Sequence, residues 1–256
     1  RFSAAASSCR DRLPSRRTPA IFPIRTTGRA MSILDDCTVT YFPLAGRGEP
    51  VRLALVIGGV KFTDERIKGS DWPSLKADTP WGQLPVLTLK DGTKLAQKSA
   101  LLALVGKLVE PKLIPADPIA AARCDELISA CEDFQASVRD AGRELQGAEK
   151  EAARKECVES GAAASWLAKL DAFVGAHGSG GHAVGDALTI ADLQLFCSVS
   201  SIFSGAMDGV PLDAVAKYAN LQRVRKTVAS LPAVVAWYDS RELAETEKAY
   251  RDARNL

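Results

Sequence analysis

The sequence predicts an α/β domain followed by an all-α domain, because two regions of the chain differ in their pattern of hydrophobic residues. Between residues 37 and 110, short β-prone runs alternate with short helical ones. Between residues 117 and 250, long amphipathic segments rich in Ala, Glu, Lys and Leu predict helices. The segment 108–118 separates these regions and holds three prolines, as is typical of a domain linker.

The first region begins with a strand, a helix and a second strand. A strand is predicted over 38–42, and a helix over 49–57. Pro50 falls in the first turn of this helix, where its missing N–H leaves no hydrogen bond unmade, and Gly58-Gly59 ends the helix. The second strand is predicted over 60–67. The region therefore opens with a βαβ unit.

A hairpin and a helix complete this region. Strands are predicted over 85–89 and 94–96, because Asp91-Gly92 between them is a typical hairpin turn. A helix over 99–108 follows. A βαβ unit followed by a ββα unit is a thioredoxin-like arrangement. The predicted fold class is therefore an α/β thioredoxin-like N-terminal domain with an all-α C-terminal domain.

The second region is predicted to contain two long helices, over 119–145 and 149–174. Further along, Thr189 and Asp192 have the spacing of a capping box, in which a Ser or Thr at the N-cap is followed three residues later by an acid. The apolar run 193–199 comes next. This pattern predicts the start of another helix.

The composition is that of an ordinary globular protein, with 46% hydrophobic and 25% charged residues. No apolar run approaches the ~20 residues of a membrane helix. Residues 1–30 hold seven of the 33 basic residues and one of the 31 acidic ones, which leaves 26 basic and 30 acidic residues in the rest. Because that part has no excess of positive charge to attract nucleic acid, we expect neither a nucleic-acid nor a membrane partner.

The first thirty residues are rich in Ser, Ala, Arg and Pro. They are similar to an organelle transit peptide. Alternatively, they are an artefact of gene modelling or cloning, since Met31-Ser32-Ile33 resembles a natural start. Under either interpretation we expect a disordered basic extension over 1–30, outside the fold. The expected location is cytoplasmic, or an organelle if this segment is a transit peptide.

The cysteines and histidines show no metal-binding spacing. No CxxC pair is present, and reduced thiols in a reducing compartment fit this pattern best. His177 and His182 stand in the Gly-rich stretch 176–185 and are interpreted as loop residues. We therefore expect no metal cofactor. The six cysteines stand at positions 9, 37, 124, 131, 157 and 197.

The stretch from Tyr41 to Pro50, Tyr-Phe-Pro-Leu-Ala-Gly-Arg-Gly-Glu-Pro, ends the first strand and leads into the first helix. It resembles the corresponding segment of cytosolic glutathione S-transferases of the tyrosine type, the sigma, alpha, mu and pi group, and is closest to sigma. In that family the tyrosine hydroxyl hydrogen-bonds the glutathione sulfur. The resemblance implies this catalytic role for Tyr41, although a tyrosine at a strand end is usually a core residue.

A second match is Gly82-Gln83-Leu84-Pro85-Val86, which enters the third strand. The resemblance implies a cis bond before Pro85 and a Leu84 backbone that pairs with glutathione as an added strand; the alternative is an ordinary trans proline. By position, the resemblance implies that glutathione is bound by Tyr41, Arg47, Trp72, Lys76, Gln83, Leu84, Pro85, Gln97, Ser99 and Asp133.

The chain departs from the family pattern at Gln97-Lys98-Ser99-Ala100-Leu101. The usual motif is Gln-Ser-x-Ala-Ile, so the serine is displaced by one residue and Lys98 takes its place. Either Lys98 pairs with the γ-glutamyl carboxylate as a point charge, or Ser99 caps the helix from the next position.

A third match is the acidic segment 125–134. In related dimers an acid at the position of Asp133 reaches across the interface toward the glutathione ammonium of the other subunit. The resemblance therefore implies a homodimer. The alternative for Asp133 is a solvated helix face.

The resemblance covers about 37–245 and implies a transferase that conjugates glutathione, its co-substrate, to hydrophobic electrophiles in detoxification. Peroxidase or prostaglandin-isomerase activity are further options, and Arg143 lies in a region that lines the second-substrate pocket of relatives. One alternative is a non-catalytic protein on the same fold, like the S-crystallins of the lens. A disulfide-exchange enzyme is least favoured, because the loop 42–48 holds no cysteine.

Overall fold

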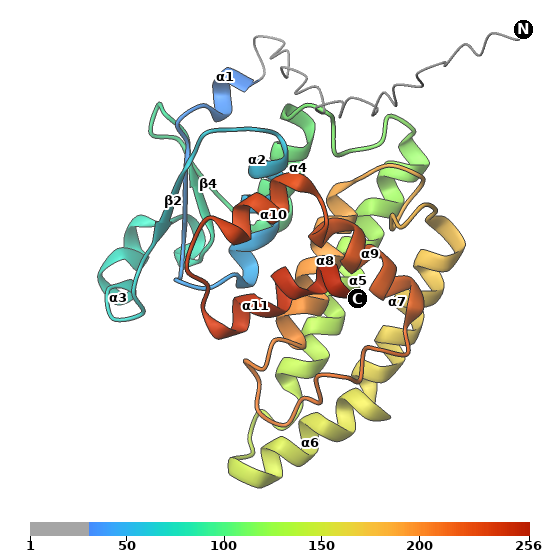
Figure 1. Cartoon of the computed structure of the whole chain (residues 1–256). Helices are drawn as coiled ribbons and strands as arrows, with labels where there is room; N and C mark the ends of the chain where they lie inside the picture. The colour runs from blue at the N-terminus through green and yellow to red at the C-terminus, as the bar shows by residue number, and fades with distance from the viewer. Residues whose placement is uncertain (1–30) are drawn as a thin grey trace, which may run out of the picture.

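The structure is a computed structural model that describes residues 31–256, so the prediction of a disordered extension over 1–30 lies outside the described residues. A four-stranded sheet with its helices forms one side of the molecule, and a group of helices forms the other (Figure 1). The predicted order, a thioredoxin-like α/β part followed by an all-α part, is confirmed.

The sheet has the strand order β2-β1-β3-β4. β1 pairs in parallel with β2 and antiparallel with β3, and β3 pairs antiparallel with β4. A parallel pair needs a crossover connection, which α2 supplies here, and the hairpin turns at Asp91-Gly92 as predicted. The strands are β1 (Thr38–Tyr41), β2 (Thr63–Arg66), β3 (Val86–Thr88) and β4 (Lys94–Ala96).

The two faces of the sheet have different neighbours. Val39 and Leu87 are paired across β1 and β3, and both are fully buried in the core that α2 and α4 complete. Because side chains alternate along a strand, Thr40 and Val86 line a cavity on the opposite face. The helices of this part are α1 (Met31–Leu34), α2 (Glu49–Ile57), α3 (Trp72–Leu75) and α4 (Lys98–Leu108).

The all-α part is organised around α8, whose side chains are almost all buried. The backbone N–H and the hydroxyl of Thr189 both donate to the Asp192 carboxylate at 2.7 Å, which confirms the predicted capping box. No helix of the described part is both long and apolar enough to cross a membrane. The helices are α5 (Pro118–Asp140), α6 (Gly147–Glu159), α7 (Ala162–His177), α8 (Ile190–Ile202), α9 (Ala219–Ala229), α10 (Pro232–Asp239) and α11 (Glu245–Asp252).

Two predicted helix boundaries were wrong. The first long helix ends at Asp140 instead of 145, and Gly142 then takes a φ of 63°, which leaves the helical path. The segment 149–174 is not one helix, because α6 and α7 are separated at Ser160-Gly161. A Cβ on Gly161 would lie 2.9 Å from the Cα of Cys157, so this close turn requires a glycine.

Candidate active site

Tyr41 ends β1, and its ring is buried where the chain leaves the sheet. The backbone N–H of Arg47 donates a hydrogen bond to the Tyr41 hydroxyl oxygen at 3.1 Å. Within residues 31–256 the hydroxyl donates to no protein acceptor. A phenol accepts and donates at the same time, so the hydroxyl proton of Tyr41 is available to a ligand atom.

Two glycines let the loop after Tyr41 fold back against the tyrosine ring. Gly46 has a φ of +46°, and a Cβ there would lie 3.0 Å from the Tyr41 hydroxyl. A Cβ on Gly48 would lie 2.9 Å from the ring carbons. The short turn η1 (Gly46–Gly48) then leads into α2, with Pro50 in the first helical turn as predicted. The Gly-Arg-Gly sequence thus allows the Arg47 N–H to approach the hydroxyl.

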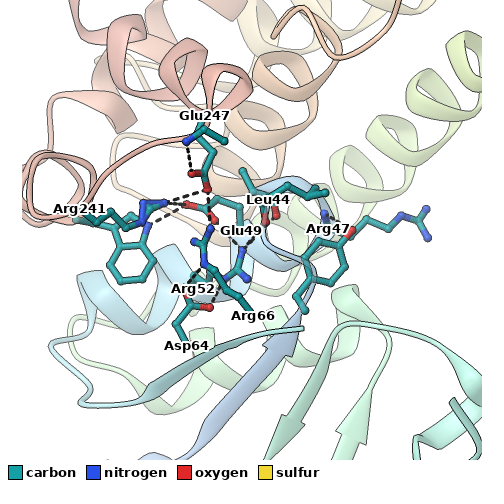
Figure 2. A network of polar contacts seen from close by, with 12 residues as sticks. Leu44, Arg47, Glu49, Arg52, Asp64, Arg66, Arg241 and Glu247 are labelled. Atoms are coloured by element: carbon teal, nitrogen blue, oxygen red, sulfur yellow. Dashed lines mark hydrogen bonds and ion pairs between the residues drawn. The ribbon is translucent and has the colours of Figure 1, made fainter. Parts of the chain in front are cut away.

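Six charged side chains meet where the sheet, α2 and the C-terminal helices join, and we call them the junction network (Figure 2). Asp64 accepts hydrogen bonds from Arg52 at 2.7 Å and from Arg66 at 2.8 Å. Glu247 accepts from Arg66 at 3.0 Å and from Arg241 at 3.2 Å. Acids and arginines therefore alternate in space. The junction network consists of Glu49, Arg52, Asp64, Arg66, Arg241 and Glu247.

Arg52 connects the junction network to the loop that holds Tyr41. Its guanidinium is fully buried and donates to Glu49 at 3.1 Å and to the carbonyl of Leu44 at 2.9 Å. It also lies 5.7 Å from the centroid of the Tyr41 ring, within the range of a cation–π contact. The side chain of Arg47 extends away from this network (Figure 2). The network therefore holds the loop on one side, and the Arg47 side chain lies on the opposite side of the loop.

A cleft borders the same loop through Arg47. Its walls come from η1, the segment before β3, the start of α4 and one side chain of α5. Six of the ten residues predicted to bind glutathione line it, so the fold brings together four segments that are separate in the sequence. The lining residues are Arg47, Gln83, Leu84, Pro85, Gln97, Lys98, Ser99 and Glu132.

The Leu84–Pro85 peptide bond is cis, which confirms the prediction. Leu84 makes no backbone hydrogen bond with another residue of the described chain, so both its N–H and its carbonyl are open to an extended ligand. The side-chain amide of Gln97 donates to the amide oxygen of Gln83 at 3.0 Å. The cleft thus offers unpaired backbone groups beside two linked amides.

Lys98 is the first residue of α4 and is only 7% exposed. Its ammonium forms an ion pair with one oxygen of Glu132, and the other oxygen accepts from the Arg47 guanidinium at 2.6 Å. We call Arg47, Lys98 and Glu132 the cleft triad. Burial lowers the pKa of Lys98, and the hydrogen bond to Glu132 opposes this shift. Two cations and one carboxylate give the triad a net positive charge.

The start of α4 lacks the serine cap that one of the two sequence alternatives predicted. The N-cap residue Gln97 makes no side-chain cap, and Ser99 lies one residue inside the helix, so Ser99 does not cap it. Lys98 instead turns its charge into the cleft. Its partner Glu132 was missed by the sequence analysis; the available signal was the adjacent acid pair Glu132-Asp133. Successive helix residues differ by about 100° in direction, so Glu132 lines the cleft while Asp133 is exposed outside it.

Three other predicted residues also lie outside the cleft lining. Tyr41 borders it only through its bond to Arg47. Trp72 lines the cavity on the opposite face of the sheet and packs edge-on against Phe42, which in turn packs against Tyr41. Lys76 is exposed to solvent. Aromatic contacts therefore connect Trp72 to Tyr41 through Phe42, whereas Lys76 has no such connection to Tyr41 within the described residues.

The cysteines of the described part are unpaired, and Cys9 lies outside it. His182 stands in a loop as predicted, whereas His177 is the last residue of α7. The described residues contain no cluster of three His, Cys, Asp or Glu side chains that would hold a metal ion.

Comparison with known proteins agrees with the fold. The family model "Glutathione S-transferase, C-terminal domain" matches residues 132–241. The chain is 35% identical over 206 residues to "Glutathione S-transferase 1" of Ascaris suum, covering 79% of this chain and 95% of the relative. It is 31% identical over 204 residues to hematopoietic prostaglandin D synthase of Gallus gallus, with the same coverage of 79% and 95%. The solved structure of prostaglandin synthase D of Nilaparvata lugens matches with a TM-score of 0.70 at 27% identity, covering 82% and 100% of the two chains.

The chain therefore belongs to the glutathione S-transferase family and is a glutathione transferase of its sigma-like group. The resemblance that the segments at Tyr41 and Leu84-Pro85 indicated in the sequence is confirmed.

Proposed function

We propose that this enzyme conjugates the thiolate of glutathione to hydrophobic electrophiles, with Tyr41 as the catalytic residue. The Tyr41 hydroxyl carries this proposal, because it accepts a hydrogen bond from the Arg47 N–H and keeps its own proton to donate. Glutathione is the co-substrate, and the proposed chemistry uses no metal.

The role of Tyr41 is to favour the thiolate of glutathione over the thiol. A free thiol has a pKa near ~8.5, so only a few per cent is ionised at pH 7. Lowering that pKa by ~2 units requires about 2.7 kcal/mol of preferential stabilisation of the thiolate. A charge-assisted hydrogen bond from the buried Tyr41 side chain supplies much of it. The thiol proton leaves to solvent, the sulfur forms a bond to the electrophilic carbon, and the leaving group departs with its electron pair.

The cleft supports the binding of an extended tripeptide. The open N–H and carbonyl of Leu84 next to Pro85 would pair with the ligand main chain as an added strand. The amides of Gln83 and Gln97 supply donors from the same wall. At the other end, Trp72 and Lys76 would meet the glycyl carboxylate.

The γ-glutamyl end of glutathione would lie against the start of α4. The first backbone N–H groups of a helix and its dipole favour a carboxylate there, and Ser99 lines the cleft at this point. Arg47 and Lys98 add positive charge.

We further propose a homodimer. Asp133 is exposed on α5 and outside the cleft of its own subunit, as a residue that acts on a second subunit would be. Trp81 is 79% exposed and lies two residues before Gln83, and a large apolar side chain held at the surface is typical of an interface. Measuring the mass in solution by light scattering tests this proposal; a monomer that stays active would contradict a required contact from Asp133.

The second substrate depends on the all-α part, where Arg143 lies just beyond α5. Detoxifying conjugation in the cytoplasm is the activity we propose first. Because relatives include prostaglandin D synthases, the same thiolate is also proposed to serve a prostaglandin isomerisation or a peroxide reduction. Neither nucleic acid nor a membrane is a proposed partner.

The decisive experiment compares the wild type with Tyr41→Phe in the conjugation of glutathione to 1-chloro-2,4-dinitrobenzene. We expect both proteins to bind immobilised glutathione, and the variant to lose 10- to 100-fold or more in kcat, roughly one lost charge-assisted hydrogen bond. Tyr218→Phe is the matched control, because it removes a tyrosine hydroxyl that bonds the Ala164 carbonyl in the all-α part.

Two outcomes would change the proposal. Full activity of Tyr41→Phe would remove Tyr41 from the mechanism. A wild type that neither binds glutathione nor conjugates it would favour the non-catalytic, S-crystallin-like alternative.

A further inference from the structure

The cleft triad contains both a cation and an anion, and these can pair with the two charges of a free amino-acid group. The γ-glutamyl end of glutathione carries a carboxylate and an ammonium on the same carbon. In the cleft, the ammonium of Lys98 and the carboxylate of Glu132 form a direct ion pair. An amino-acid zwitterion can enter such a pair head to tail, so that every charge again meets an opposite one.

We propose that the γ-glutamyl group inserts between Lys98 and Glu132 of the same subunit, with its carboxylate on Lys98 and its ammonium on Glu132. This inference rests on the proposed binding of glutathione in the cleft. It makes the triad the determinant that selects a peptide with an intact amino-acid end, and it places this determinant within one subunit.

Burial explains why both ligand charges are needed. Lys98 is 7% exposed and Glu132 is its ion-pair partner, so an event that separates the pair must supply Lys98 with another anion. Glu132 can release one oxygen without moving away, because Arg47 holds the other at 2.6 Å. The Arg47 side chain is 49% exposed, so its guanidinium can move with the Glu132 carboxylate and keep their hydrogen bond. The freed oxygen then accepts from the ligand ammonium.

The pair also accounts for the altered motif at the start of α4. A serine at position 98 would offer a neutral hydroxyl and would need no counter-ion. The buried lysine needs one, and Glu132 from α5, 34 residues away in the sequence, supplies it. An ammonium has three N–H donors. Its contact to Glu132 is therefore compatible with a second acid, such as Asp133 from another subunit.

The test measures binding of three S-methyl ligands by isothermal titration calorimetry. S-methylglutathione has the whole γ-glutamyl group, its glutaryl analogue lacks the ammonium, and its 4-aminobutyryl analogue lacks the carboxylate. For the wild type we expect each truncation to weaken binding roughly 30-fold or more, the effect of removing one member of a buried charge pair.

Each variant should strongly reduce one of these two preferences. Lys98→Met should retain only a small part of the wild-type preference for S-methylglutathione over the 4-aminobutyryl analogue. Glu132→Gln should likewise retain only a small part of the preference for S-methylglutathione over the glutaryl analogue. Lys98→Arg should retain the preference for the carboxylate, which separates loss of charge from misfolding. Lys107→Met on α4 and Glu126→Gln on α5 are matched controls, since both residues are exposed and outside the cleft.

The possible failures are distinguishable. If the wild type binds S-methylglutathione but Lys98→Met and Glu132→Gln keep its ligand preferences, this inference is wrong and the proposed function stands. If the wild type binds none of the three ligands, the proposed function fails and the inference fails with it.

Discussion

The junction network and the cleft triad are built from the same kinds of side chain but differ in net charge. Both join the α/β part to the all-α part. The network has three acids and three arginines, and Glu49 and Arg52 at its centre are fully buried. The triad has two cations for one acid, and Arg47 and Glu132 are 49% and 29% exposed.

This difference indicates what each cluster does. A neutral network with a buried centre has no net charge to offer a ligand, and removing one member leaves its partners unpaired. It therefore holds elements in place, among them the loop that positions the Arg47 N–H on Tyr41. A partly exposed cluster with an excess cation is stabilised by binding an anion.

Arg52→Met should have the largest effect on stability. It leaves Glu49 without its buried cation and removes the bond to the Leu44 carbonyl. We expect a loss of about 3–5 kcal/mol in the free energy of unfolding, measured by urea denaturation, and a loss of conjugation activity in the protein that remains folded. Lys90→Met, which breaks an exposed pair with Asp36, is the control and should leave the midpoint nearly unchanged. An equal shift in both variants would contradict the contrast between buried and exposed pairs.

Glu247→Gln should lower the stability of the protein without disturbing the loop after Tyr41. Glu247 is 2% exposed and accepts from Arg66, Arg241 and the Ala244 N–H, none of which belongs to the loop after Tyr41. Because the amide keeps one acceptor oxygen, we expect a smaller loss of about 1–3 kcal/mol. The kcat per folded molecule should stay close to that of the wild type. A kcat that falls as far as in Arg52→Met would show that the loop depends on the whole network.

Lys98→Met should stabilise the protein at pH 7, because it removes a buried charge whose desolvation outweighs its pairing, while it weakens glutathione binding. The folded-state pKa of Lys98 lies below its ordinary value of 10.5, because burial disfavours the charge. Between these two values the unfolded wild type binds more protons than the folded one, so wild-type stability rises with pH there. The advantage of the variant should therefore be largest at neutral pH and narrow toward pH 10.5.

Urea midpoints of both proteins between pH 7 and 10 check this prediction. A variant that is less stable than the wild type across the whole range would mean that Lys98 is a structural residue like Arg52.

The ion pair between His182 and Asp192 should give the smallest effect. The Asp192 carboxylate lies 3.7 Å from Nδ1 of His182 and raises the pKa of this histidine above 6.5. Because the folded-state pKa is raised, the stabilisation is fully present below pH 6.5 and is lost as the pH rises through the folded-state pKa. The wild type should thus lose slightly more stability than His182→Gln between pH 5.5 and 8. Parallel curves for the two proteins would rule out this pair as a contributor.

Several local features were predictable from the sequence because residues close together in the chain determine them. The Thr189–Asp192 capping box and the Asp91-Gly92 turn depend on a few neighbouring residues. The segment around Tyr41 and the cis bond before Pro85 followed from the family resemblance. The break between α6 and α7 was missed because a single Gly161 inside a long helical pattern is a weak signal.

The sequence by itself determined the order of an α/β part and an all-α part, the Pro/Gly loop between Tyr41 and the first helix, and Lys98 as the point of departure from the family. Only the tertiary structure decided which charges meet. Arg66 finds Glu247 across 181 positions of sequence, and Lys98 finds Glu132 across 34. Long charged side chains have no sequence periodicity that identifies a distant partner. The packing of whole helices brings them within reach, and burial then makes an opposite charge necessary.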